Sequence, residues 1–248
     1  MVDGGSWHMV PGACRNLEIE DVNIMSRVCT GDGIDIVGCE DVTLRDSFIR
    51  ASDDCVCIKA ASYPDPAANR NVKNILVEHC VLWNAEPGNA VEIGYEVRCD
   101  EISDITFRDL DIVHCQYEGN QSGGVLTIHN ADRAYIHNIV YEDIRVEDAQ
   151  EKFIDIKVLD SKYSLDRSRG RVEDIFFRNI EILNGNFPVS IVRGFEMHTE
   201  MSRPQNIHFD NVVVLGEQIN SPSDLHMVVE LSNDIWFNGK DRVKRNPF

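Results

Sequence analysis

The sequence predicts an all-β fold, a single-stranded right-handed parallel β-helix in which the chain winds as a solenoid of about seven coils. Two observations favour this fold class. A nine-residue phrase of alternating apolar and polar residues recurs along the chain, and a further short apolar strand lies between successive copies. Helical periodicity is absent over any window of useful length, so no helical layer is expected.

Each copy of the phrase begins with Asn or Asp, and successive copies begin 25 to 36 residues apart. Period-two alternation, interrupted by Asp, Asn or His, predicts two short strands joined by a bend. Val, Ile and Phe dominate the apolar positions, which suits a half-buried pleated sheet. The copies are NLEIEDVNI from Asn16, DVTLRDSFI from Asp41, NILVEHCVL from Asn74, DITFRDLDI from Asp104, NIVYEDIRV from Asn138, DIFFRNIEI from Asp174 and NIHFDNVVV from Asn206.

A third strand is expected between the copies. Three strands per repeat, stacked about 4.8 Å from those of the preceding repeat, describe a coil whose strands pair with their counterparts in the next coil. A β-sandwich is the competing fold, but Asn-Gly hairpin turns occur only at residues 184–185 and 238–239, so the solenoid is favoured. The third strands are GIDIV from Gly33, CVCIK from Cys55, AVEIG from Ala90, VLTIH from Val125, FIDIK from Phe153, VSIVR from Val189 and MVVEL from Met227.

Residues 1–248 are expected to form a single parallel β-helix domain. No amphipathic helix precedes the first coil, although solenoids usually carry a polar cap over the end of their core. The end of the core could lack a cap, carry an unusual cap or be covered by an oligomeric contact, and the sequence does not decide among these. The oligomeric state is not predicted. The N-terminus lacks the basic and apolar regions of a secretory signal. A secreted or periplasmic location is expected if a signal was removed, and a cytoplasmic one otherwise.

The composition limits the partners. A net charge of −18 argues against nucleic acid and against anionic membrane surfaces, since both require a cationic face. No apolar run approaches the roughly 18 residues of a membrane span. The eight cysteines include no Cys-x-x-Cys pair, so no zinc site is predicted. Mostly reduced thiols packed in the core are expected, with one disulfide possible.

The third strands place polar side chains in a column on the outer side of their sheet. Alternation turns the apolar residues inward, and in-register stacking aligns the polar ones. This column comprises Asp35, Cys57, Glu92, Thr127 and Asp155, with Lys59, His129 and Lys157 in a neighbouring column.

Two turns rich in Gly, Ser and Asp enter this sheet in consecutive coils. One carries Asp32 and the next carries the pair Asp53-Asp54. Asp is common in turns for conformational reasons alone. Three carboxylates meeting on one surface, however, are what acid–base hydrolysis of a sugar bond requires. Because like charges repel, one of the three is expected to hold a proton while the others ionise.

Thr-Gly-Asp-Gly-Ile-Asp at residues 30–35 and Ser-Asp-Asp-Cys-Val-Cys-Ile-Lys at residues 52–59 resemble the signatures of the polygalacturonase family, glycoside hydrolase family 28. The resemblance extends from Ser6-Trp7 to about Val146. It implies a right-handed β-helix of the pectin-lyase-like clan, inverting hydrolysis of a carbohydrate substrate, and no metal or organic cofactor. Asp54 would match the family's general acid, and Asp32 and Asp53 the pair that activates the water.

The sequence also departs from this family. The family's Gly-His-Gly motif falls on Gly88-Asn89-Ala90, and its Arg-Ile-Lys motif, which grips the galacturonate carboxylate, falls on Thr127-Ile128-His129. Without that Arg and Lys, an acidic sugar has no evident counter-charge. The predicted substrate is therefore a polysaccharide or oligosaccharide other than plain polygalacturonate. The candidate substrate-binding residues are Asp35, Lys59, Asn89, Glu92, Tyr95, Thr127 and His129, and Trp83 and Tyr117 are further aromatic candidates.

Two other function classes remain open on the same fold. One is a non-catalytic carbohydrate-binding β-helix. The other is a polysaccharide lyase or epimerase, which needs a base or a calcium ion near a uronate, and for which Lys59 and Lys157 are the candidate bases. Sugar, linkage and endo or exo mode depend on loops such as residues 61–71 and 116–124.

Overall fold

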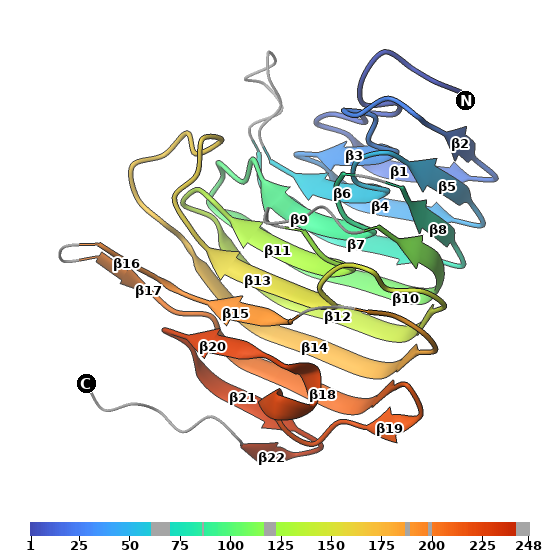
Figure 1. The fold of residues 1–248 in the computed structure, drawn as a ribbon. Coiled ribbons are helices and arrows are strands. Elements are labelled where there is room, and N and C mark those ends of the chain that lie inside the picture. Colours follow the sequence, from blue (N-terminus) through green and yellow to red (C-terminus); the bar gives the residue numbers. More distant parts are fainter. Residues whose placement is uncertain (61–69, 86, 117–122, 187–188, 198–199, 242–248) are drawn as a thin grey trace.

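The computed structural model describes residues 1–60, 70–85, 87–116, 123–186, 189–197 and 200–241. The chain forms a right-handed parallel β-solenoid whose coils stack from the N-terminal to the C-terminal end, which confirms the predicted fold class (Figure 1). Two long sheets face each other across the core. No helix in the described parts of the chain has the length and apolarity needed to cross a membrane.

The larger sheet contains the two-part phrase of each repeat. Its main strand order is β1-β4-β7-β10-β12-β14-β18-β21-β22, and the two parts merge into single long strands from β10 onward. The strands are β1 (Arg15–Glu20), β2 (Asn23–Met25), β4 (Glu40–Arg45), β5 (Phe48–Ala51), β7 (Val72–Glu78), β8 (Val81–Asn84), β10 (Glu101–Cys115), β12 (Tyr135–Val146), β14 (Arg171–Ile182), β18 (Gln205–Val214), β19 (Glu217–Gln218), β21 (Asn233–Phe237) and β22 (Lys240–Asp241).

The second sheet contains the predicted third strands, in the order β20-β15-β13-β11-β9-β6-β3. They are β3 (Ile34–Val37), β6 (Val56–Lys59), β9 (Val91–Tyr95), β11 (Leu126–Asn130), β13 (Ile154–Val158), β15 (Ile191–Arg193) and β20 (Val228–Glu230). Outside both sheets, β16 (Phe195–Met197) and β17 (Glu200–Ser202) form a hairpin, and η2 (Pro222–Leu225) is a 3₁₀ turn.

The predicted count of about seven coils is slightly too high, because the solenoid has about five regular turns. Seven strands still stack in the second sheet. At its C-terminal end, however, β15 and β20 pair over only three residues, which is too short to complete a regular turn.

Left-handed residues give the repeated phrase its shape. The first residue of all seven copies has φ between 53° and 57°, and the sixth has φ between 48° and 55°. Asn and Asp adopt this conformation at less cost than other residues that carry a Cβ. Side chains at the same position of successive phrases also form hydrogen bonds across coils. For example, Asn74 Nδ2 donates to Asp41 Oδ1 at 2.7 Å. The bend predicted inside each phrase is therefore confirmed, and a second bend opens it.

Five aromatic rings stack through the core, one per coil. Their centroids lie 4.8 to 5.0 Å apart, close to the spacing of paired strands. All eight cysteines are free, and six of them are buried, in agreement with the predicted thiols. The stacked rings are those of Phe107, Tyr141, Phe177, Phe209 and Phe237.

The register of the second sheet aligns the polar column as predicted: Asp35 with Cys57, Cys57 with Glu92, Glu92 with Thr127, and Thr127 with Asp155. Its exposure differs from the prediction, because these side chains are at most 2% exposed. The column points away from the apolar core but lies beneath other segments. In the neighbouring column, for example, Lys59 Nζ lies over the Trp7 ring and the Tyr95 ring stacks on His129.

Candidate active site

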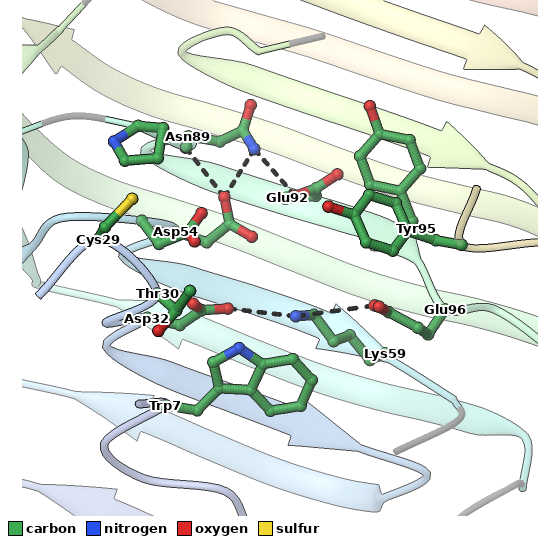
Figure 2. A pocket seen from close by; sticks show the side chains of 14 residues that line it. Trp7, Cys29, Thr30, Asp32, Asp54, Lys59, Asn89, Glu92, Tyr95 and Glu96 are labelled. Carbon is green, nitrogen blue, oxygen red and sulfur yellow. Dashed lines mark hydrogen bonds and ion pairs between the residues drawn. The ribbon is translucent and has the colours of Figure 1, made fainter. Parts of the chain in front are cut away.

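A cavity of about 360 Å³ lies over the second sheet at β6 and β9, and it contains all three predicted catalytic aspartates (Figure 2). Most of its polar lining is acidic. The lining residues are Trp7, Cys29, Thr30, Asp32, Asp53, Asp54, Lys59, Pro87, Gly88, Asn89, Glu92, Tyr95, Glu96 and Tyr163.

The turns before β3 and β6 bring Asp32 and Asp54 together. Gly33 N donates to Asp54 O at 2.8 Å, so the two turns stack directly. A Cβ at Gly33 would lie 2.4 Å from the Cys55 carbonyl oxygen, and only glycine permits this approach. The pairing of consecutive coils thus gathers carboxylates that are about twenty residues apart in sequence.

Asp32 is the proton-holding member of this cluster. Burial raises the pKa of Asp32 to about 10, the nearby charge of Asp54 adds to the shift, and Lys59 opposes it. Asp32 is 2% exposed, and its Oδ1 has no hydrogen-bond partner within the described part of the chain. Strongly coupled carboxyls titrate together, so the proton belongs to the cluster as well as to Asp32.

Lys59 is held by carboxyl groups on several sides. Its Nζ lies 3.2 Å from Asp32 Oδ2, 2.9 Å from Asp35 Oδ1 and 3.7 Å from Glu96 Oε2. It also lies 3.7 Å from the centroid of the Trp7 ring, which is seen beside it in Figure 2. Burial by itself lowers the pKa of Lys59, but the surrounding negative groups outweigh burial and raise it well above its usual range. Lys59 is therefore a charged ion-pair partner.

Asn89 connects two carboxyl groups of the cavity. Asp54 Oδ1 accepts from Asn89 N at 2.9 Å and from Asn89 Nδ2 at 2.6 Å. The same Nδ2 donates to Glu92 Oε2 at 2.8 Å (Figure 2). Gly124 N donates to Asn89 Oδ1 at 2.8 Å, and because a backbone N–H can only donate, it determines which end of the amide faces the carboxyls.

Behind the cavity, the network continues through His129. Its Nδ1 lies 2.6 Å from Glu92 Oε1, and its Nε2 lies 3.5 Å from Asp155 Oδ2. Burial, together with the charge of Asp54, raises the pKa of Glu92 well above its usual range. Burial alone would raise the pKa of Asp155, but its contacts with His129 and Lys157 lower it. Glu92 is thus favoured as a neutral acid and Asp155 as a carboxylate.

Among the described residues, one close set of three groups has metal-ligating atoms, namely Asp54, Cys57 and Glu92. The thiol does not suit a metal, because Cys57 Sγ donates to Gly94 O at 3.1 Å and burial raises its pKa well above the usual range. A thiolate is the ligating form of cysteine, so this set is a poor metal site.

Residues 3–218 match the sequence model of the glycosyl hydrolases family 28. The chain belongs to this family. Two exopolygalacturonases of Zea mays are each 26% identical to it, over 181 and 185 residues, which is 70% of this chain and 40% of theirs. The chain thus spans about two fifths of the length of the curated relatives it matches.

Solved family 28 structures share the fold. A hyperthermoactive exopolygalacturonase from Thermotoga maritima aligns with a TM-score of 0.65 at 16% identity, covering 97% of this chain and 51% of that one. The family 28 exopolygalacturonase of Yersinia enterocolitica aligns with a TM-score of 0.53 at 11% identity, covering 97% and 45%. At these identities the likeness establishes the β-helix and not the substrate.

Of the seven substrate-binding candidates in this family 28 chain, four line the cavity: Lys59, Asn89, Glu92 and Tyr95. The other three, Asp35, Thr127 and His129, have 0% exposure and lie behind its wall. They do not line the cavity, and their predicted substrate contacts remain predictions. Each supports the wall instead: Asp35 pairs with Lys59, Thr127 Oγ1 donates to Val91 O at 3.1 Å, and His129 stacks on Tyr95.

Of the two further aromatic candidates, Trp83 does not line the cavity. Trp83 packs edge-on against His114 and beneath Arg50. Tyr117 lies outside the described residues.

Sequence reasoning missed several lining residues of this family 28 cavity. Glu96 continues the alternation of Glu92 and Gly94, so a longer reading of that strand could have found it. Trp7 was included in the family resemblance but was given no role. Tyr163 lies on the loop after β13, and its ring is tilted against Tyr95 with centroids 5.3 Å apart. Nothing local in the sequence marks that long-range contact.

Proposed function

We propose that this chain hydrolyses O-glycosidic bonds of a polysaccharide or oligosaccharide with inversion, using Asp32, Asp53 and Asp54 as its acid and base groups. The observation that carries the proposal is the meeting of these three aspartates in one cavity of a family 28 β-solenoid. The exopolygalacturonase relatives support a glycosidase of the polygalacturonase type.

In the proposed reaction Asp54 protonates the leaving glycosidic oxygen. Its Oδ1 already accepts two N–H groups from Asn89, so Oδ2 is the oxygen that carries and releases the proton. Asp32 and Asp53 accept a proton from the water whose oxygen bonds to the anomeric carbon as the glycosidic bond breaks. In the proposed reaction the proton held by Asp32 passes to Asp54 when substrate binds.

The proposed substrate is a neutral glycan and not plain polygalacturonate. Five acidic side chains line the cavity, namely Asp32, Asp53, Asp54, Glu92 and Glu96. Lys59 is the only Lys or Arg among the described lining residues, and its Nζ lies within 3.7 Å of three acidic side chains. A uronate would therefore enter a site of unfavourable charge. Trp7, Tyr95 and Tyr163 offer aromatic faces or edges to a neutral sugar.

A panel of neutral and acidic polysaccharides, assayed by the release of reducing ends, tests both parts of this proposal. The wild-type chain is expected to cleave a neutral glycan faster than polygalacturonate. Asp54→Asn is expected to lower kcat by at least about 100-fold, the usual contribution of a general acid, with an unchanged circular dichroism spectrum. Full activity of this variant would refute the hydrolase, whereas a preference for polygalacturonate would refute only the neutral substrate.

A non-catalytic carbohydrate-binding protein is the second candidate. The observation that favours it is Asn89, which stands where the family motif has histidine. Glycan binding without release of reducing ends in the same panel would establish it. A lyase or epimerase is disfavoured, because, of its two candidate bases, Lys59 is held in its charged form and Lys157 does not line the cavity.

A further inference from the structure

Glu92 sits at the junction between the cavity and the buried column. Its Oε2 accepts from the Asn89 amide that also donates to Asp54, and its Oε1 lies 2.6 Å from His129 Nδ1. With Asn89 Oδ1 taken by Gly124 N, each polar atom of the Asn89 side chain is occupied. The orientation of the amide on Asp54 therefore depends on Glu92.

The contact between His129 and Asp155, on the side of the ring opposite Glu92, bears on which of these groups carry a proton. Asp155 Oδ2 is 2.8 Å from Lys157 Nζ, so it is an ion-paired carboxylate that can only accept. It lies 3.5 Å from His129 Nε2, which makes no hydrogen bond within the described residues, so the negative charge of Asp155 favours the ring proton on Nε2 by electrostatic attraction alone. In a neutral imidazole Nδ1 is then an acceptor, and the atom that donates to it is a protonated Glu92 Oε1. A carboxyl oxygen of Glu92 also lies within 4.8 Å of one of Asp54, and the two groups share the Asn89 Nδ2 donor, so a single negative charge on the pair is favoured.

We propose that Glu92 is a positioning residue of the glycosidase proposed above: a neutral carboxyl, held by His129, that keeps the Asn89 amide aimed at Asp54. The inference rests on the proposed function for its kinetic consequence, but the protonation of Glu92 is independent of it. Removing the Glu92 carboxyl leaves the amide held only by Gly124 N and Asp54, so the side-chain hydrogen bond to Asp54 Oδ1 weakens while the backbone N–H of Asn89 still donates to that oxygen.

The surroundings of Glu92 are consistent with this assignment. From the preceding coil it faces Asp54, Cys57 and Lys59, from its own segment Glu96, and from the following coil His129. Burial and the charge of Asp54 are the two largest influences that raise its pKa, and Lys59 only partly offsets them. A neutral acid at this position avoids placing another negative charge beside Asp54.

Carbon-13 NMR of the carboxyl groups, recorded on the whole chain without ligand, tests the protonation. The Glu92 resonance is identified by its absence from Glu92→Gln. It is expected to titrate well above the midpoint of about 4.3 that an ordinary glutamate shows. An ordinary midpoint would overturn the proposal whether or not the chain is a hydrolase.

Kinetics on the panel glycan that the wild-type chain cleaves fastest test the positioning. Glu92→Leu is expected to lower kcat by about 10- to 100-fold, a loss typical of a misdirected general acid, with KM changed less than about threefold. Glu92→Gln, which can accept from Asn89 and donate to His129 like the neutral acid, is expected to recover most of that loss. Glu181→Gln, an exposed residue of β14, is the matched control.

Three outcomes separate the two proposals. If Asp54→Asn is inactive while Glu92→Leu keeps full kcat, the positioning role is wrong and the hydrolase stands. If Glu92→Gln and Glu92→Leu are equally impaired, a neutral carboxyl is not what the site requires. If Glu92→Leu fails to fold, the NMR titration and Glu92→Gln still decide, since a tenfold loss of kcat in Glu92→Gln would also overturn the assignment.

Discussion

At the scale of single residues, the aspartate pair depends on a glycine from the next coil. Gly88 has φ +97°, and a Cβ built on it would lie 2.4 Å from the Asp53 carbonyl carbon and 2.7 Å from its Cα. The backbone of Asp53 cannot yield without moving Asp54. Gly88 thus allows the cavity wall to approach the turn that carries the proposed acid.

Gly88→Ala is therefore expected to destabilise the chain by more than about 2 kcal/mol and to lower kcat, because positive φ and a backbone clash both oppose it. Gly216→Ala is the matched control, since Gly216 has φ +85° but nothing within 4 Å of its added Cβ. Urea denaturation measures both variants. Equal destabilisation of the two would show that the contact with Asp53 is unimportant.

Asp32 gives stability a distinct pH dependence. Its pKa rises from 3.8 to about 10 on folding, so the folded state binds its proton more tightly than the unfolded state does. Stability is then unaffected below the unfolded pKa and falls as pH rises from about 4 towards about 10. The Asp32 carboxyl, proposed for catalysis, therefore lowers the free energy of unfolding at neutral pH.

Asp32→Asn is expected to be inactive but increasingly more stable than the wild type as pH rises from about 5 to about 9, because it removes this penalty. Thermal unfolding at a series of pH values measures the difference in Tm. The exposed substitution Glu181→Gln controls for general charge effects. A difference in Tm that does not change with pH would contradict the shifted pKa of Asp32.

At the scale of elements, the Asn and Asp bends determine where each strand of the larger sheet begins and turns. Asn138 is the first residue of the repeated phrase that lies in β12. It has φ 54°, and its side chain is exposed. Its role is therefore one of backbone conformation and of bonding to Asp104 in the preceding coil. Neither the backbone conformation of Asn138 nor its hydrogen bond to Asp104 depends on burial of apolar surface.

Asn138→Ala is expected to cost about 1–2 kcal/mol, the penalty of left-handed backbone for a residue with a Cβ. Asn138→Gly should cost less, because glycine adopts this conformation freely even though it loses the side-chain hydrogen bond. Chemical denaturation of both variants provides the comparison. If alanine and glycine are equivalent, the hydrogen bond and not the bend accounts for the recurring Asn or Asp.

At the scale of the whole molecule, stability comes from contacts between successive coils. The core rings illustrate this, since Phe177 stacks between Tyr141 and Phe209, with centroids 4.9 and 4.8 Å away. Phe237 ends the stack and contacts one ring of it, Phe209. In a solenoid each coil is stabilised by its neighbours, so position along the rod matters.

Phe177→Ala is accordingly expected to destabilise the chain by about 3–5 kcal/mol, and Phe237→Ala by clearly less, because the central ring loses stacking on both faces. Guanidinium denaturation midpoints measure both. Equal losses would mean that the ring stack adds nothing beyond the burial of each side chain.

Much of this architecture is encoded locally. The alternation, the recurring Asn or Asp and the short third strands predict the β-helix, and the register they imply aligns Asp35 with Cys57 and Glu92 as found. The spacing of Asp32 and Asp53 likewise predicts that their turns lie in consecutive coils. These features follow from periodicity and turn conformation, which nearby residues determine.

By itself, then, the sequence determined the solenoid, the strand register and the three aspartates of the cavity. Only the tertiary structure decided that the polar column is buried, that Lys59 is surrounded by carboxyl groups and that His129 contacts Glu92. Those outcomes depend on non-repetitive segments such as those carrying Trp7, Gly124 and Tyr163. Their paths over the sheet are governed by long-range packing, which no local pattern records.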